Sequence, residues 1–344
     1  MAELVEKLCN IGGVSGDEGD IREFIRSYIK EYVDELTVDS MGNLIALKKG
    51  KSDAKRIMLS AHMDEVGFII SGFTEKGYLE FKTVGGIDTR VIISKKVFIG
   101  KNKVPGIIGI KAVHLQKPSE RESVPSVSSL YIDIGASSKD EAKSKVSLGD
   151  YAVFDTKFSS FGTDKFKAKA IDDRIGCAVL MNAIKKDVKY DTYFCFMTQE
   201  EVGLRGARIA ASRVCADIAL VVEATTCSDI HGVTEENYVT TLGGGAVITT
   251  RDRSTIVPDD YQKKLIKLAE DNKIPYQYKK STSGGNDAGA IHITGEGVKT
   301  ASVSLPCRYI HSPIGVASYS DYESVKKLIN AYIDNIDEFV SEEK

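Results

Sequence analysis

The sequence predicts an α/β protein with a central, mostly parallel sheet and a small β-rich domain inserted into it. Short apolar runs typical of buried strands alternate with amphipathic helical patterns in residues 1–66 and again in residues 163–344. Residues 67–162 differ, because short β-type runs separated by glycines and polar turns replace the helical periods. We therefore expect a discontinuous three-layer α/β domain made of residues 1–66 and 163–344, and a barrel-like insertion at residues 67–162.

The first segment contains one helix and three strands by its pattern. The tetrapeptide SGDE at 15–18 has the spacing of a capping box and predicts a helix from about residue 18 to residue 33. The runs at 35–39 and 43–47 are typical of strands joined by a turn. A short apolar strand at 56–61 ends at His62, within the sequence LSAHMDEVGFII.

The middle segment supplies six short runs of β-forming residues. They lie at 66–73, 79–83, 96–99, 106–110, 130–134 and 151–154. Strands of this length, each bounded by turn residues, are typical of a small barrel or another β-rich domain, so we expect one here.

The last segment returns to alternating strands and helices. A helical pattern covers 173–185, apolar strands follow at 193–198 and 218–222, and an amphipathic helix is expected at 262–272. The second strand ends directly before Glu223. The tetrapeptide SDYE at 320–323 repeats the capping-box spacing and predicts a terminal helix.

Composition and charge exclude several classes of protein. The 344 residues include 46 basic and 49 acidic side chains, a net charge of −3, so there is no basic field for nucleic acid or for a membrane surface. No run of 18 apolar residues occurs, and MAELVEKLCNIGG lacks the features of a signal peptide. The six scattered cysteines form no C-x-x-C pair, which argues against a thiolate zinc cluster. We expect a cytoplasmic protein, because mostly buried thiols fit a reducing compartment.

Histidines and carboxylates follow apolar runs at five places in the chain. The carboxyl ends of strands are where an open α/β sheet places its active site, so we expect these side chains to converge. The candidate residues are His62, Asp172, Asp173, Glu200, Glu201, Glu223 and His311.

Such a set favours a two-metal hydrolase. Two divalent ions about 3.5–4 Å apart need a bridging carboxylate, further carboxylates and imidazoles, and a shared water. Imidazole together with carboxylate suits zinc, cobalt or manganese. In the doublet Glu200-Glu201, one carboxylate can take the proton of the water while its neighbour binds metal. Asp64 can accept a hydrogen bond from the distal nitrogen of His62 and so fix its tautomer.

Each of these features also has an ordinary structural explanation. An isolated H-x-D is most often a structural or surface feature, and a carboxylate doublet that opens a helix usually caps it and complements its dipole. Glu200-Glu201 alone would be a solvated turn. Glu223 is less ordinary, since a carboxylate after an apolar strand is partly buried and needs a partner. The common placement of all these residues favours a shared site.

Six blocks of the sequence together resemble one family. In chain order they are SAHMDEVGF (60–68), KAIDDRIGC (169–177), TQEEVGLRGA (198–207), VVEATT (221–226), SGGNDAGAIH (283–292) and PCRYIHSPIGVAS (306–318). They resemble the M42 metallo-aminopeptidases, a group also labelled glutamyl aminopeptidase, FrvX-like hydrolase and cellulase M. The resemblance extends over nearly the whole chain in the right order.

The resemblance implies an enzyme that removes N-terminal residues from peptides with two divalent metal ions, zinc or cobalt before manganese. It also implies a cis peptide bond between Asp172 and Asp173. The family more usually has Asp at the position of Glu223, which leaves the coordination geometry and the metal preference open. By this resemblance, His62 and Glu223 bind one metal ion, and Glu201 and His311 bind the other. Asp172 bridges the two ions. Glu200 is the general base, and Asp64 orients His62.

The resemblance further implies that residues 67–162 mediate dimerisation. The implied assembly is a homo-oligomer, and the form common in the family is a tetrahedral dodecamer built from dimers. The insertion seen in the sequence is compatible with this assembly.

Two other functions stay open. A glycan hydrolase, which the cellulase M label implies, needs two carboxylates and usually no metal, so two strand-end histidines would be unexplained. Aromatic sugar platforms would also favour Trp, and the chain has none. A metal-dependent assembly protein with a degenerate site would be expected to lack the base or the bridge, yet Glu200 and Asp172 are both present.

Overall fold

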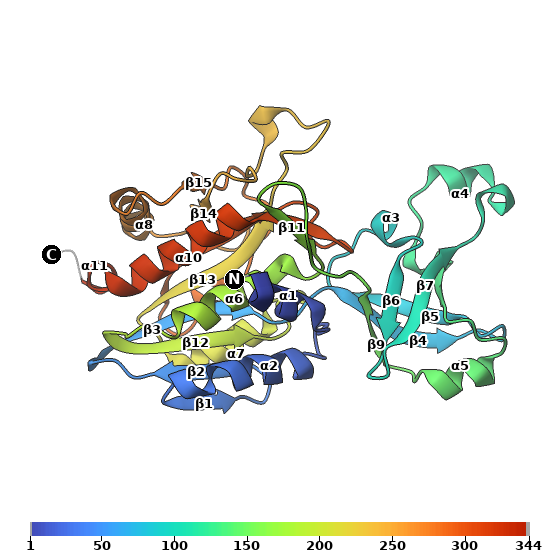
Figure 1. Cartoon of the computed structure of the whole chain (residues 1–344), viewed down its shortest axis with the longest axis horizontal. Helices are drawn as coiled ribbons and strands as arrows, with labels where there is room; N and C mark the ends of the chain where they lie inside the picture. The colour runs from blue at the N-terminus through green and yellow to red at the C-terminus, as the bar shows by residue number, and fades with distance from the viewer. Residues whose placement is uncertain (1, 342–344) are drawn as a thin grey trace.

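The computed structural model describes residues 2–341, and Figure 1 shows a larger body of strands and helices next to a smaller body of strands and short helices. Both ends of the chain lie in the larger body, whereas the smaller body comes from the middle of the chain. The expected class, an α/β fold with a mostly parallel central sheet and an inserted barrel, is confirmed.

An eight-stranded sheet forms the centre of the larger body. Its strands are β1 (Glu35–Val38), β2 (Leu44–Lys48), β3 (Ser52–His62), β12 (Tyr190–Met197), β13 (Ile218–Thr226), β14 (Ala246–Ile248), β15 (Tyr276–Tyr278) and β16 (Lys299–Cys307). In space they follow the order β1-β2-β12-β3-β13-β16-β14-β15. The four strands β12, β3, β13 and β16 are parallel, so their carboxyl ends meet at one edge of the sheet.

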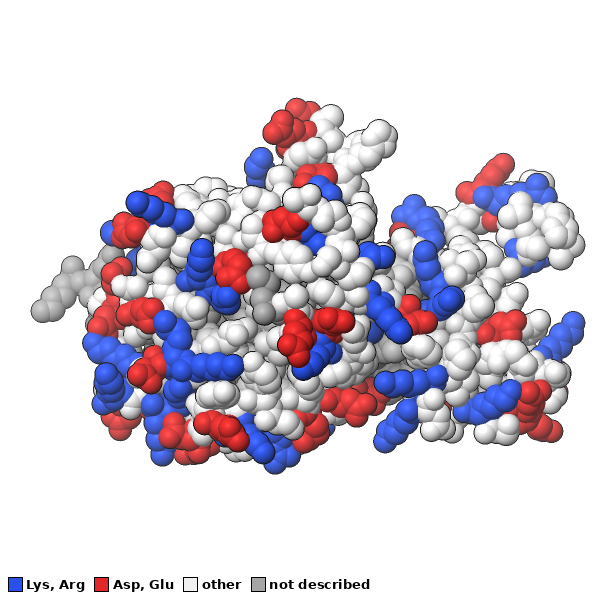
Figure 2. All heavy atoms as spheres, in the orientation of Figure 1, with Lys and Arg blue, Asp and Glu red and all other residues white. Residues whose placement is uncertain are grey.

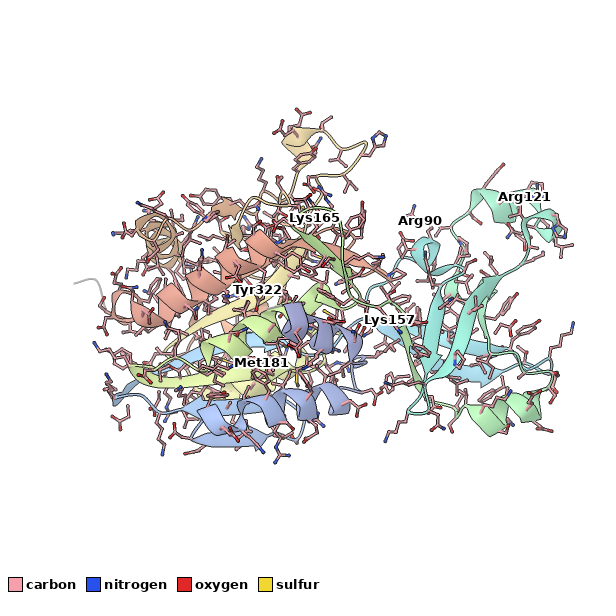
Figure 3. The ribbon with its side chains drawn as sticks, in the orientation of Figure 1. Arg90, Arg121, Lys157, Lys165, Met181 and Tyr322 are labelled. Carbon is pink, nitrogen blue, oxygen red and sulfur yellow. The ribbon has the colours of Figure 1, made fainter. Side chains whose placement is uncertain are left out.

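Helices cover both faces of this sheet and give the expected three layers. One face packs against α1 (Ala2–Asn10), α2 (Gly19–Ile29), α6 (Ile171–Ala183), α8 (Asp259–Asp271) and α10 (Tyr319–Asp334), and the other against α7 (Arg205–Val214) and α9 (Ala288–Ile291). Alternate residues of β3 serve the two faces, since Leu59 packs in the first layer and Met58 in the second. Figure 3 labels Met181 of α6 and Tyr322 of α10, which are both buried in the first layer.

Six antiparallel strands close into a barrel in the smaller body. They are β4 (Gly67–Phe73), β5 (Leu79–Val84), β6 (Lys96–Ile99), β7 (Val104–Ile110), β8 (Leu130–Asp133) and β9 (Tyr151–Phe154), in the barrel order β4-β5-β8-β7-β6-β9. Phe68 makes edge-on contacts in the core with Phe81 and Phe154, at centroid distances of 5.1 Å. All six β-type runs of the middle segment are therefore strands.

A three-stranded sheet lies where the chain returns from the barrel to the larger body. It contains β10 (Ser159–Ser160), β11 (Lys165–Ala168) and β17 (Gly315–Ser318). Because Ala168 pairs with Gly315, the segment after β11 and the segment before β17 lie side by side. The sequence led us to expect that the strand before Asp172 belongs to the central sheet. It belongs to this three-stranded sheet instead. The boundaries at residues 66 and 162 stay a prediction.

The remaining helices are short. They are the 3-10 helices η1 (Lys30–Tyr32), η2 (Val113–Leu115), η3 (Val127–Ser129) and η4 (Glu235–Asn237), and the α-helices α3 (Thr89–Ile92), α4 (Pro118–Glu122), α5 (Lys139–Lys145) and α11 (Asp337–Val340). Among residues 2–341, no helix has both the length and the apolar character needed to cross a bilayer. Figure 2 shows acidic and basic side chains intermingled over the visible face, in keeping with the net charge of −3.

The first expected capping box is wrong, although a helix does follow it. Helix α2 begins at Gly19, and its N-cap residue Glu18 makes no side-chain capping bond. The hydroxyl of Ser15 instead donates to Asp64 at 2.6 Å. The serine therefore serves the segment after β3, which lies 49 residues away in the sequence.

The second expected capping box is displaced by two residues. Helix α10 begins at Tyr319, and its N-cap is Ser318, whose hydroxyl accepts from the amides of Ser320 and Asp321. The hydroxyl of Ser320 donates to Asp164 at 2.6 Å. Three serines lie within residues 312–320, so the spacing rule alone selected the wrong one.

Candidate metal centre

The carboxyl ends of β3 and β12 place two turns side by side. Strand β3 ends at His62, which pairs with Met197 at the end of β12. The turn after β12 carries Glu200 and Glu201, and the turn after β3 carries Asp64. Parallel neighbouring strands thus bring together residues that are distant in the sequence.

His62 is buried, and its two ring nitrogens face different groups. Nδ1 lies 3.0 Å from the carbonyl oxygen of Asp64 and 3.3 Å from its carboxylate. Nε2 lies 3.1 Å from Oδ1 of Asp172 and 3.4 Å from Oε1 of Glu223. Because Asp64 offers only acceptors to Nδ1, this arrangement favours a proton on Nδ1 and leaves Nε2 available to a cation.

Asp172 lies between two imidazoles. Its Oδ1 is 3.1 Å from Nε2 of His62, and its Oδ2 is 3.2 Å from Nε2 of His311. The same nitrogen of His311 lies 3.2 Å from Oε2 of Glu201. A carboxylate whose two oxygens face two different nitrogen donors has the geometry of a bridge between two cations.

Asp173 is also buried here, but backbone amides already occupy its carboxylate. Its Oδ1 accepts from the amide of Gly176 at 2.9 Å, and its Oδ2 accepts from the amide of His62 at 3.2 Å. Asp173 does lie close enough to His62 and Glu223 to share a cation with them. Asp172 is the better bridge, because its oxygens face imidazoles. The peptide bond between Asp172 and Asp173 is cis.

Glu223 lies inside a strand and not after one, which corrects the expectation from the sequence. Strand β13 continues to Thr226, and Glu223 pairs with Ser304 of β16. Its side chain is buried, and its Oε2 has no hydrogen-bond partner in the described part of the chain. Leaving a buried acceptor without a partner costs about 1–3 kcal/mol, and a bound cation would remove this cost.

Asp64 joins the two turns. It is fully buried, and its Oδ1 accepts from the backbone amide of Glu200 at 3.0 Å. Its Oδ2 accepts from the amide of Glu201 at 3.1 Å and from the hydroxyl of Ser15 at 2.6 Å. One carboxylate therefore holds both the ring of His62 and the backbone of the glutamate doublet.

Burial and neighbouring charges shift the pKa values of this cluster. Burial raises the pKa of Glu201 and of Glu223 to about 8, with the charge of Asp172 adding to each effect, and raises the pKa of Glu200 well above its usual range. Burial acts to lower the pKa of His311, but Asp172 and Glu201 raise it to about 9. Without cations, protons must therefore stabilise carboxylates that lie too close together to be all charged.

This donor set fits divalent cations. Imidazole nitrogens and carboxylate oxygens are ligands that zinc, cobalt and manganese accept. Bound cations would take over the charge compensation that protons provide in their absence. The unpartnered oxygen of Glu223 and the two-sided contacts of Asp172 fit such ions better than they fit a purely structural cluster.

A family comparison agrees with this geometry. Residues 42–328 match the M42 glutamyl aminopeptidase family. The chain belongs to the M42 family. It is therefore an aminopeptidase, a hydrolase, of a metal-dependent family.

Two relatives cover nearly the whole M42 chain. A putative aminopeptidase of Acetivibrio thermocellus is 43% identical over 333 residues, which span 96% of this chain and 97% of the relative. The lysyl aminopeptidase of Pyrococcus furiosus is 30% identical over 342 residues, or 97% of each chain. The family is named for glutamyl and this relative for lysyl substrates, so membership alone does not set the preferred first residue.

Solved structures share the whole fold of the M42 chain. An aminopeptidase from the archaeon Desulfurococcus kamchatkensis gives a TM-score of 0.93 at 34% identity, over 97% of this chain and 94% of that chain. The TET1 peptidase of Pyrococcus horikoshii, which can assemble into a tetrahedron or a large octahedral shell, gives 0.85 at 36% identity, over 96% and 98%.

The M42 chain has three further histidines, which we expect to be dispensable for metal binding. His114 lies in η2 of the smaller body, and His231 lies in an exposed loop. His292 directs Nδ1 to the carbonyl oxygen of Ala288 at 2.9 Å. Within residues 2–341, none of the three belongs to a group that could hold a metal ion. Their dispensability in binding stays a prediction.

Sequence reasoning missed two buried residues near the M42 site. Ser15 was assigned to a capping box, and its spacing carried no sign of the bond to Asp64. Asp287 is fully buried, neither of its oxygens has a partner among the described residues, and its charge contributes to the raised pKa of Glu200. The block GGND at 284–287 was the available signal for it.

A cavity of about 180 Å³ opens onto the M42 site. Ligand candidates, strand ends and a glycine-rich loop line it. The lining residues are His62, Asp172, Glu200, Glu223–Thr226, Thr249, Lys279, Ser283–Asn286, Ser304, Ile310 and His311.

Proposed function

We propose that this chain is a two-metal aminopeptidase that removes N-terminal residues from peptides. The observation that supports this most is Asp172, whose two oxygens face His62 and His311 within one site. His62 and Glu223 would hold one ion, Glu201 and His311 the other, and Asp172 both. When bound, zinc, cobalt or manganese ions supply Lewis acidity and lower the pKa of a shared water.

Glu200 is the proposed general base. It lines the cavity beside the ligand candidates, and in the described chain its carboxylate has no hydrogen-bond partner, so it is free to accept a proton. The backbone amide of Glu200 donates to Asp64 at 3.0 Å, which holds the main chain from which this side chain extends. Glu200 takes the proton of the attacking water and returns it to the leaving amine.

Changing Glu200 to glutamine tests this assignment. We expect Glu200→Gln to keep its metal content, measured by elemental mass spectrometry, and to lose about 10²–10⁴-fold in turnover of an aminoacyl-arylamide. Glu296→Gln is a matched control, because Glu296 is exposed and lies outside the cavity. Turnover of Glu200→Gln near the wild-type rate would overturn the role as base, and loss of metal would make Glu200 a ligand.

Metal removal separates this function from the two alternatives. Arylamide cleavage should stop with a chelator and return when zinc, cobalt or manganese is added back. Glycan cleavage that survives the chelator would support a glycosidase, since two carboxylates suffice for that reaction. Bound metal without peptide or glycan turnover would support a metal-dependent assembly protein.

We also propose a cytoplasmic homo-oligomer in which the barrel mediates dimerisation and dimers build a tetrahedral dodecamer. The shared fold with the TET1 peptidase supports this. Exposed apolar side chains in the barrel segment support it too, at Ile107, Val113, Leu115, Val124 and Leu148. All six cysteines are free thiols, which fits a reducing compartment. Native mass spectrometry of the wild type should show assemblies with multiples of two chains. The double substitution Val113→Glu and Leu115→Glu should shift the mass to that of the monomer.

A further inference from the structure

The central sheet divides at its carboxyl edge, between β3 and β13. Residues 57–60 of β3 pair with residues 218–221 of β13, and the pairing ends there although both strands continue. On its other side, β13 stays paired with β16 as far as Thr226. Within the described chain, residues 222–226 therefore have a partner strand on one side only, and we call them the free edge of β13.

A buried carboxylate keeps the two strands from pairing further. The amide of Met63 donates to Met197 of β12, so the amide of His62, one residue earlier, is directed towards β13. This amide donates to Oδ2 of Asp173 at 3.2 Å instead of continuing the ladder. Because Asp173 is fully buried, the separation of β3 from the free edge of β13 is built into the fold.

The backbone groups of Ala224 and Thr226 are directed away from β16. The amide of Cys227 donates to the carbonyl oxygen of Cys307 in β16 at 2.9 Å. Successive residues of a strand direct their backbone groups to opposite sides. The amide and carbonyl groups of Ala224 and Thr226 therefore point to the side on which β13 has lost its pairing with β3.

Two of these four backbone groups have no partner. The amide of Ala224 donates to Oε1 of Glu223 at 3.1 Å, and the carbonyl oxygen of Thr226 accepts from the hydroxyl of Thr240 at 2.9 Å. Within residues 2–341, the carbonyl oxygen of Ala224 and the amide of Thr226 make no hydrogen bond. Ala224 and Thr226 line the same cavity as His62 and Glu223, so a ligand in this cavity can bind both groups.

We propose that the free edge of β13 binds the main chain of the peptide substrate as an added strand. This inference rests on the proposed aminopeptidase function. The reacting bond must lie at the ligand candidates, among them Glu223, and only one substrate residue precedes that bond. Thr225 lies two residues, or about 7 Å, beyond Glu223, so the part of the substrate level with it follows the reacting bond.

The third residue of the substrate fits this position. With the first residue level with Glu223, the third is level with Thr225, and the substrate runs parallel to β13. In a parallel pair, one residue donates its N–H to one strand neighbour and accepts through its C=O from another. The N–H of the third residue thus meets the carbonyl oxygen of Ala224, and its C=O meets the amide of Thr226. The free edge then recognises the peptide main chain and not a particular side chain.

The test uses the pentapeptide Leu-Ala-Ala-Ala-Ala and two analogues of it, N-methylated at the third or at the fourth residue. The two analogues carry the same added group, but only the N–H of the third residue faces β13. We expect kcat/KM for leucine release to be at least about 3-fold lower for the third-residue analogue, in the range of one neutral hydrogen bond. Versions with a reduced CH2–NH first bond, which cannot be hydrolysed, should differ in Kd by the same factor.

Two variants of Thr226 test the protein side of the contact. Thr226→Pro removes the amide, which has no hydrogen bond to lose within the described chain. We expect the difference between the two analogues to fall below about 2-fold in Thr226→Pro. It should persist in Thr226→Ala, which keeps the amide and is the matched comparison. Should Thr226→Pro fail to fold, the two analogues on the wild type decide the question.

Three results would overturn the inference. Equal kcat/KM for the two analogues on the wild type would remove the added strand and leave the aminopeptidase function intact. A loss confined to a peptide methylated at its N-terminal nitrogen would assign the carbonyl oxygen of Ala224 to the free amine instead. Failure of the metal-loaded wild type to cleave any peptide or arylamide would overturn the proposed function and this inference together.

Discussion

Replacement of Asp64 by asparagine tests how one buried side chain organises the site. The carboxylate faces four donors, namely the amides of Glu200 and Glu201, the hydroxyl of Ser15 and the ring of His62. Asparagine has nearly the same shape, but one of its oxygens is replaced by an NH2 group that only donates. Each oxygen of Asp64 accepts from one backbone amide, so either orientation of the new side chain points two donors at each other.

The expected loss follows from these contacts. A hydrogen bond to a charged group contributes about 1.5–3 kcal/mol, and the substitution removes one such bond and the charge that strengthens the others. Counting two bonds' worth of stabilisation, we expect the free energy of unfolding to fall by about 3–6 kcal/mol. Loss of a group that orients a metal ligand typically costs about 10–100-fold in affinity or activity, so kcat/KM should fall by a similar factor.

Urea unfolding and arylamide kinetics measure the two effects on the same preparation. Ser15→Ala is the graded comparison, since it removes only the bond at 2.6 Å and should cost about 1.5–3 kcal/mol. An Asp64→Asn protein as stable as Ser15→Ala, with kcat/KM close to the wild type, would refute the reasoning. It would mean that packing of the turns, and not this carboxylate, positions His62 and the glutamates.

Three further predictions concern metal, pH and the core. Asp172→Ala should bind fewer than two metal equivalents by elemental analysis, because among residues 2–341 it removes the one carboxylate that faces both imidazoles. In metal-free protein, the pKa values of Glu201 (about 8) and His311 (about 9) are raised, so the folded state binds more protons than the unfolded state. This proton binding stabilises the fold at lower pH, and Tm should therefore fall as the pH rises through this range. Metal-loaded protein should not show this fall. Glu65→Ala leaves two buried cations, Lys169 and Arg174, without this partner and should cost about 3–5 kcal/mol in urea unfolding. Glu75→Ala, at an exposed ion pair, should leave the free energy of unfolding almost unchanged.

The sequence predicted the strands and the convergence of the site well, for a physical reason. Short continuous apolar runs define strands that are buried on both faces, and parallel strands must bring their carboxyl ends to a common edge. This rule alone predicts that His62 and the turn at 199–201 lie side by side, as the parallel pairing of β3 and β12 confirms. Glu223 was placed less well, because a carboxylate inside a strand interrupts the apolar run and looks like its end.

The remaining features depend on distant contacts that no local pattern encodes. Ser15 has the spacing of a helix cap, but it lies before the N-cap residue of α2, and its hydroxyl donates to a buried carboxylate 49 residues away. Asp172 and Asp173 are adjacent and chemically identical, yet one faces imidazoles and the other backbone amides. Lys279 has the sequence pattern of a surface loop residue, yet the fold places it in the same cavity that Glu223 lines.

Two short segments fix the geometry of this site before any cation binds. Residues 62–65 and 172–174 contact each other at successive positions, and each segment contributes both site residues and anchoring residues. The contacts are His62 Nε2 with Asp172 at 3.1 Å, the amide of His62 with Asp173 at 3.2 Å, the carbonyl oxygen of Met63 with Arg174 at 2.8 Å, and Glu65 with Arg174 at 3.3 Å. Because Arg174 is fully buried and also donates to the carbonyl oxygens of Leu8 and Ile11, α1 holds the same unit. Movement of either ligand candidate would require breaking buried charged bonds, so we expect the protein, and not bound ions, to set the distance between His62 and Asp172.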